Sequence, residues 1–171
     1  EGQAVRKISE KPVFGLFIVE LGSRRVVHVA ATRNPSQDWT AQQIRNATMD
    51  GDGPKFLLRD NDDKFGAAFD RAAQGVGARV IRIEVGAPNM NAVCERTLGR
   101  ARRECLDHCI VPNDQHLGRL LAEYARYFNE ARPHQGLGQQ VPDRPDAGGA
   151  KGGRVVAIPV LGGLHHDYRR A

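Results

Sequence analysis

The sequence predicts an α/β fold in which helices cover a mixed sheet. Two observations predict this: an opening pair of apolar strands joined by a short link, and a later strand–helix–strand unit. A short link joins antiparallel neighbours, whereas a crossover helix joins parallel ones. A chain with both features therefore forms a sheet with both strand directions, and helices are needed to bury its faces.

Four strands are expected from short runs of β-branched, aromatic or alternating apolar residues: residues 13–19, 25–30, 55–59 and 79–83. Gly22-Ser23 is the turn signal between the first two. The first pair is thus a hairpin, and the second pair flanks a short helix.

Four helices are expected from apolar residues at helical spacing: residues 36–46, 65–74, 89–107 and 114–131. Ser36 can cap the first of them. In the last, Leu117, Leu121, Tyr124 and Phe128 form one apolar stripe. Such a stripe is typical of a helix that packs on a sheet.

The chain has 171 residues, a length that suits one domain with a hydrophobic core. We expect the core in residues 1–137, followed by a Gly/Pro-rich linker and carboxy-terminal tail in residues 138–171. No apolar run approaches the roughly 18 residues of a membrane span, and no signal segment opens the chain. We therefore expect a cytoplasmic protein without a membrane partner. The formal net charge of +5 permits a polyanionic partner.

Two metal-site patterns are incomplete. Cys105, His108 and Cys109 lie close in sequence but lack a fourth ligand at usual zinc spacing. The odd cysteine count, three, favours reduced thiols that are buried or idle. Asp60-Asn61-Asp62 resembles the start of a calcium loop, but Lys64 stands where the next ligand should be.

The strongest candidates for chemistry are two acids. Asp60 lies where the third predicted strand ends, which is where sites gather in α/β sheets. Glu95 lies in the helix after the fourth strand. Their spacing alone decides little because acidic residues are common, so their flanking sequences matter more.

Four segments carry a more specific pattern: Leu58-Arg59-Asp60-Asn61-Asp62-Asp63-Lys64-Phe65, Ala87-Pro88-Asn89-Met90-Asn91-Ala92-Val93-Cys94-Glu95-Arg96, Arg102-Arg103-Glu104-Cys105 and Tyr127-Phe128-Asn129-Glu130-Ala131-Arg132-Pro133-His134-Gln135-Gly136-Leu137. Together they resemble the integrase-like catalytic core of bacterial insertion-sequence transposases, a relative of the retroviral integrase core. The resemblance covers residues 13–137. It implies an RNase H-like mixed sheet, with antiparallel strands followed by parallel strands and flanked by helices. It also implies a polynucleotidyl transferase that cuts and joins DNA.

In that family two Asp and one Glu hold Mg²⁺ or Mn²⁺. Asp60 matches the second Asp, and Glu95 matches the Glu. The first Asp should precede the acid that ends the next strand, here Glu20, which makes Glu1 the candidate for the first acid. A Glu at this position departs from the family pattern. Glu20 itself is expected to be a structural acid at a strand end.

The carboxylates suit the chemistry that the resemblance implies. Phosphodiester cleavage must activate a poor nucleophile and stabilise a leaving oxygen, and paired divalent cations can do both. Mg²⁺ prefers oxygen ligands and keeps several waters. Asp60 and Glu95 can hold one cation, and a third acid is needed for two.

The predicted helix around Glu95 carries candidate DNA contacts. Asn91, Glu95 and Arg102 share one face. Arg102 matches a basic position of the family pattern and, with Arg103, can grip a DNA phosphate. A solvated basic face is the simpler alternative. The partners implied are DNA, as transposon ends and target, and further copies of the chain assembled on it.

Two rival functions stay open. The departure at Glu1 favours a catalytically inactive transposase remnant that only binds DNA or self-associates. An unrelated α/β hydrolase is disfavoured, because the sequence has neither a nucleophile elbow nor a phosphate loop. His134 is expected to pack or cap rather than to catalyse.

Overall fold

The structure is a computed structural model that describes residues 12–49, 51, 53–83, 88–143 and 152–170. Its helices and strands are β1 (Phe14–Val19), β2 (Val26–Thr32), α1 (Gln37–Ala47), β3 (Phe56–Arg59), α2 (Ala67–Gly75), β4 (Arg79–Arg82), α3 (Pro88–Glu104), α4 (Asp114–Glu130), β5 (Val155–Val160) and β6 (His165–Arg170). Three single 3-10 turns accompany them: η1 (Leu106–His108), η2 (Gln135–Leu137) and η3 (Leu161–Gly163). The predicted helices and first four strands are confirmed to within a few residues.

The strand directions are as the sequence predicts. β1 and β2 are antiparallel, with Phe14 opposite Thr32. β3 and β4 are parallel, with Phe56 opposite Arg79. The mixed α/β fold class is therefore confirmed. The two pairs nevertheless form separate two-stranded sheets, because no strand among the described residues hydrogen-bonds to both of them.

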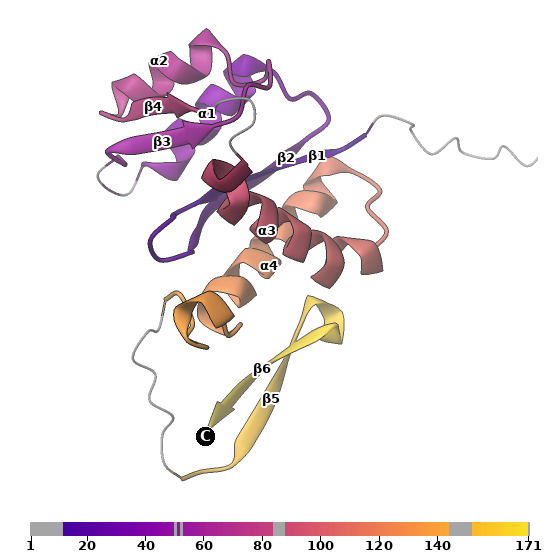
Figure 1. The fold of residues 1–171 in the computed structure, drawn as a ribbon. Coiled ribbons are helices and arrows are strands. Elements are labelled where there is room, and N and C mark those ends of the chain that lie inside the picture. The colour runs from indigo at the N-terminus through magenta and orange to yellow at the C-terminus, as the bar shows by residue number, and fades with distance from the viewer. Residues whose placement is uncertain (1–11, 50, 52, 84–87, 144–151, 171) are drawn as a thin grey trace, which may run out of the picture.

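The helices lie in two groups. Figure 1 shows α1 and α2 beside β3 and β4 at one end of the molecule, and α3 and α4 on the other side of the β1–β2 hairpin. Ala41, Ile44, Phe69 and Ala72 of α1 and α2 form one buried cluster, against which Ile18 of β1 and Leu57 of β3 both pack. The α1–α2 pair thus covers both strand pairs, although these share no hydrogen bonds.

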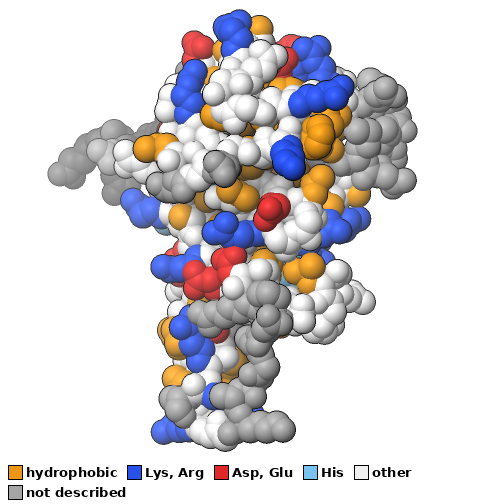
Figure 2. All heavy atoms as spheres, turned by 90° about the vertical axis from the view of Figure 1, so that its left-hand side faces the viewer, with side chains coloured by type: hydrophobic (Ala, Val, Ile, Leu, Met, Phe, Trp, Pro, Cys, Tyr) orange, Lys and Arg blue, Asp and Glu red, His pale blue; other side chains and the backbone are white. Residues whose placement is uncertain are grey.

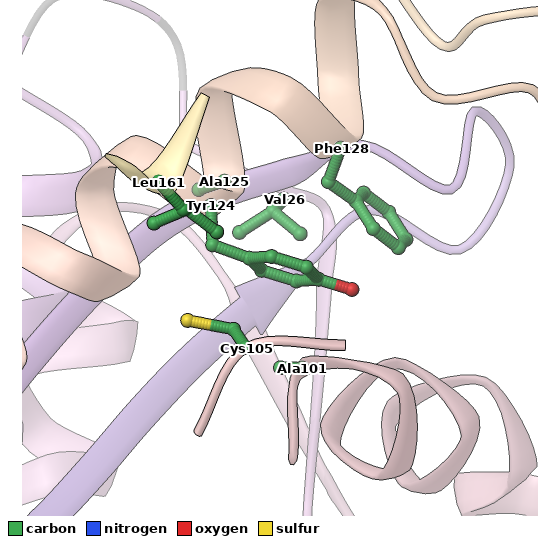
Figure 3. Packing of buried hydrophobic residues seen from close by; sticks show 7 residues of the cluster. All are labelled: Val26, Ala101, Cys105, Tyr124, Ala125, Phe128 and Leu161. Carbon is green, nitrogen blue, oxygen red and sulfur yellow. The ribbon is translucent and has the colours of Figure 1, made fainter. Parts of the chain in front are cut away.

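A second buried cluster joins β2, α3, α4 and the η3 turn: Val26, Ala101, Cys105, Tyr124, Ala125, Phe128 and Leu161. Figure 3 shows the Tyr124 ring lying between Val26 on one side and Cys105 and Ala101 on the other. Burying a side chain of this size contributes roughly 1.5–3 kcal/mol. This cluster fixes α3, the helix that carries Glu95, against α4 and the β1–β2 hairpin.

Asn129 closes the outer edge of β2. Its amide group donates to the Val26 carbonyl oxygen (2.8 Å), and its carbonyl oxygen accepts from the Val26 N–H (2.9 Å). The side chain is buried, so it replaces the pairing that a neighbouring strand would give. One side chain of α4 therefore satisfies both backbone groups of Val26.

The last strands form a hairpin, although a tail was expected here. β5 and β6 are antiparallel, with Val155 opposite Arg170 and Val160 opposite His165. The η3 turn between them enters the second cluster through Leu161. Among the described residues, no helix is long and apolar enough to cross a membrane.

Replacing Asn129 by Ala should destabilise the fold strongly. Both polar groups of Val26 would lose their partner, at a cost on the order of 1–3 kcal/mol for each buried group left unsatisfied. Urea denaturation followed by circular dichroism measures the change in the free energy of unfolding. The control is Asn46→Ala on the exposed side of α1, which should cost little. Equal unfolding curves for the two variants would contradict this role of Asn129.

Candidate functional site

A buried arginine fixes the backbone at Asp60. The Arg59 guanidinium forms two 3.0 Å hydrogen bonds to the Asp70 carboxylate on α2. A third nitrogen donates to the Asp60 carbonyl oxygen at 2.9 Å. Arg82 of β4 also donates to Asp70, at 2.9 Å. The hydrogen bonds from Arg59 and then Arg82 hold the pKa of Asp70 below its ordinary value. Sequence reasoning missed this cluster, whose one signal is a charged Arg59 at the end of an apolar strand.

The loop after β3 is ordered by its own acids. The Asp60 carboxylate accepts from the Asp62 N–H (3.1 Å), and the Lys64 ammonium lies 2.6 Å from the Asp62 carboxylate. The hydrogen bond from Lys64 lowers the pKa of Asp62. Asn61 donates to the Ile83 carbonyl oxygen (2.9 Å), which ties the loop to the end of β4. Asp60 is exposed and keeps acceptor capacity beyond this turn, because a carboxylate offers about four lone-pair sites.

Glu95 is exposed on α3, one residue after the partly buried Cys94. Burial raises the pKa of the Cys94 thiol, and the negative charges of Asp60 and Glu95 raise it further. Because Asn61 ties the loop after β3 to Ile83, shortly before α3 begins at Pro88, this loop lies near the start of α3. The fold therefore brings Asp60 and Glu95 to the same part of the molecule.

The donor set fits a hard divalent cation only in part. Asp60 and Glu95 offer exposed carboxylate oxygens, which leave room for the waters that Mg²⁺ keeps. Within the described ranges, no group of three His, Cys, Asp or Glu side chains is arranged to hold a metal ion. Glu1, the candidate for the first acid, lies outside the described residues. Glu20 accepts a hydrogen bond from Ser23 in the β1–β2 turn, as expected of a structural acid.

The candidate DNA contacts lie along α3. Asn91 is partly buried near the first turns of α3, whereas Arg102 and Arg103 are exposed in the last turn. The Arg102 Nε lies 3.4 Å from Asp107, and both side chains are more than half exposed, so this ion pair contributes little. Figure 2 shows Lys and Arg side chains spread over one face of the molecule, with fewer acidic ones.

The segment from Tyr127 to Leu137 has structural roles. His134 is buried, and its Nε2 is hydrogen-bonded to the Phe128 carbonyl oxygen (2.9 Å). Burial lowers the pKa of His134. This contact agrees with the expectation that His134 packs rather than catalyses. Arg132 holds Glu104 of α3 through contacts of 2.6 and 2.8 Å, a pair that sequence reasoning missed.

The cysteines form no cross-links among the described residues. Cys105 is fully buried, and burial raises its pKa to about 12, with a smaller effect from Cys109. A thiol that stays protonated is a poor metal ligand. The interpretation of these cysteines as buried or idle therefore agrees with the structure.

The chain is similar to known mobile-element proteins. Residues 76–142 match the integrase core domain family. The insertion element IS476 uncharacterized 39.2 kDa protein of Xanthomonas euvesicatoria is 29% identical over 128 residues, which are 74% of this chain and 37% of that protein. The insertion element IS407 uncharacterized 31.7 kDa protein of Burkholderia multivorans is 27% identical over 128 residues, again 74% of this chain and 46% of that protein. The chain thus spans less than half the length of these two relatives.

The matched domain contains α3 with Glu95, the Glu104–Arg132 pair and the segment with His134, whereas Asp60 precedes it. Both similar proteins are encoded by insertion elements. Over residues 76–142 the chain is therefore similar to integrase core domains, and over 128 residues it is similar to two insertion-element proteins.

Proposed function

We propose that this chain transposes DNA by metal-dependent cleavage and transfer of DNA strands, with Asp60 and Glu95 as metal ligands. The observation that supports this most is that Asn61, next to Asp60, donates to the Ile83 carbonyl oxygen at 2.9 Å, shortly before the start of α3, the helix of Glu95. Two negative charges in one region repel each other, and a bound cation relieves that repulsion. The pair is therefore suited to Mg²⁺ or Mn²⁺, and the protein would act in the cytoplasm.

When bound, the cation would activate the attacking oxygen and stabilise the leaving one. The chain's own contribution is to hold the ligands still. Arg59 fixes the Asp60 backbone, and its side chain is only 5% exposed, so it has little freedom to move. Glu95 sits on a helix that Ala101 and Cys105 pin to the second cluster. Rigid supports of this kind keep ligands in a productive geometry.

DNA is the proposed partner, both as transposon ends and as target. Arg102 and Arg103 would bind phosphates, and Asn91 would contact the DNA near Glu95 on the same helix. Seven residues separate Glu95 from Arg102, which is about 10 Å along a helix. This is the scale of a few nucleotides along one strand, so one strand can reach both residues. Assembly of several copies on the DNA is part of the same proposal.

The alternative is an inactive remnant that only binds DNA or self-associates. It is favoured by the departure at Glu1, where the family pattern has an Asp. Glu1 remains the proposed first acid. The two functions differ in a single measurable property, which is DNA cleavage that depends on Mg²⁺ or Mn²⁺.

Asp60→Asn and Glu95→Gln should each abolish metal-dependent nicking of a supercoiled plasmid. The loss should exceed about 100-fold, because even outer-shell partners of metal ligands are worth about 10–100-fold. The matched control is Asp63→Asn, an exposed acid in the same loop, which should keep its activity. Circular dichroism should show all three variants folded. Normal cleavage by either variant would refute the assignment of the replaced residue as a metal ligand. A wild-type chain that shows no metal-dependent nicking would instead support the inactive remnant.

Arg59→Lys should lower the apparent affinity for the metal ion without abolishing metal-dependent nicking. Lysine keeps the charge but loses the fork that joins Asp70 to the Asp60 carbonyl oxygen. We expect the Mn²⁺ concentration for half-maximal nicking to rise by about 10-fold, by analogy with outer-shell partners. The control is Arg82→Gln, which removes the other contact to Asp70 without touching Asp60. Equal Mn²⁺ requirements in the two variants would show that Arg59 only stabilises the fold.

A further inference from the structure

The β5–β6 hairpin turns one face away from the body of the molecule. Figure 1 shows it at the opposite end from α1, α2, β3 and β4. In β6, Asp167 is buried and its neighbours His166 and Tyr168 are exposed. The strand register places six side chains on the exposed side, here called the outer ribbon face: Val155, Ala157, Pro159, His166, Tyr168 and Arg170.

The other end of the hairpin is firmly anchored. The Leu161 N–H donates to the Glu123 carboxylate of α4 at 2.6 Å. The His165 Nε2 lies 2.6 Å from the Glu104 carbonyl oxygen, and its ring stacks on Tyr127 with centroids 4.9 Å apart. A two-stranded hairpin alone is marginally stable in water. These anchors hold the ribbon in place while its outer face stays open.

The exposed side chains of the β5–β6 hairpin include basic and aromatic ones. Its arginines are Arg154, Arg169 and Arg170, and its one acid, Asp167, is buried and paired with Arg169 at 2.6 Å. The ribbon therefore carries a charge of +2, three arginines less one aspartate, with neutral histidines. Tyr168 is 69% exposed, and its ring lies 6.1 Å from the exposed His166 ring, measured between centroids. Figure 2 shows basic side chains at the foot of the molecule, where this hairpin lies.

We propose that the outer ribbon face is a second DNA-binding surface, separate from the Asp60–Glu95 site. The inference rests on the proposed function, because it takes DNA as the partner. A two-stranded ribbon fits the major groove of a duplex. Arg170 would contact phosphates, and Tyr168 with Val155 would pack against sugars and base edges.

A second copy of the chain fits this face less well. Two identical ribbons packed against each other would bring like charges together, because an isologous contact repeats the same patch on both sides. Like charges directly opposite each other destabilise a strand pair. DNA phosphates instead neutralise Arg170 on this face and release counterions. The charge of the ribbon therefore favours a polyanion.

The test measures DNA affinity of the full chain without catalysis. Fluorescence anisotropy of a labelled, random-sequence duplex in EDTA gives the Kd over a series of salt concentrations. The double variant Tyr168→Ala/Arg170→Gln should bind about 10-fold more weakly, and the slope of log Kd against log salt should fall by about 1. The control Arg45→Gln, at the far end on α1, should change neither. Arg170→Glu should weaken binding further.

An unchanged Kd and slope in the ribbon variants would overturn the inference. So would a loss of self-association, measured by sedimentation without DNA, at unchanged DNA affinity, because the ribbon would then join protein copies. Because EDTA removes metal, failure of the catalytic assignment appears only in the nicking assay, and failure of the ribbon appears only here.

Discussion

Glu104 is the residue on which most of this architecture depends. Its carboxylate binds Arg132 and accepts from the Tyr124 hydroxyl at 2.9 Å, and its carbonyl oxygen meets His165. Burial alone would raise its pKa, but the hydrogen bonds from Arg132 and Tyr124 bring that pKa below its ordinary value. It therefore stays ionised and paired at neutral pH. One residue at the end of α3 thus ties the helix of Glu95 to α4 and to the β5–β6 hairpin.

Arg59 has a similar structural role among β3, β4 and α2. It joins β3 to α2 through Asp70 and fixes the backbone from which Asp60 projects. Arg59 contacts the Asp60 backbone and Glu104 contacts Tyr124 of α4, so both hold elements that carry the proposed ligands. Burial raises the pKa of the Cys94 thiol, and the charges of Asp60 and Glu95 raise it further. Geometry at the candidate site is therefore set by ion pairs that lie outside it.

The sequence predicted the helices and strands, which local residue patterns control. It did not predict the side-chain contacts between residues that are distant in the sequence. Strands and helices followed from apolar spacing, whereas Asp60 and Glu95 were selected by their flanking residues and stay predictions. The segment from Tyr127 to His134 was picked out as specific, but its physical role was not visible. Asn129, Arg132 and His134 satisfy the backbone of Val26, the carboxylate of Glu104 and the carbonyl of Phe128. Two of these partners lie far away in the sequence, and only the fold brings them together. The hairpin of β5 and β6 was missed because its anchors, Glu104 and Glu123, also lie far from it.

The first acid is the part of the proposed site that lies outside the described residues. Ile18 of β1 and Leu57 of β3 pack on the same helices, yet no described strand hydrogen-bonds to both β1 and β3. The family resemblance implies a first acid on an opening strand, and Glu1 is the candidate for it. Asp60 and Glu95 can together hold one cation, whereas chemistry with paired cations needs a further ligand. The proposed strand transfer therefore depends on the first acid as much as on Asp60 and Glu95.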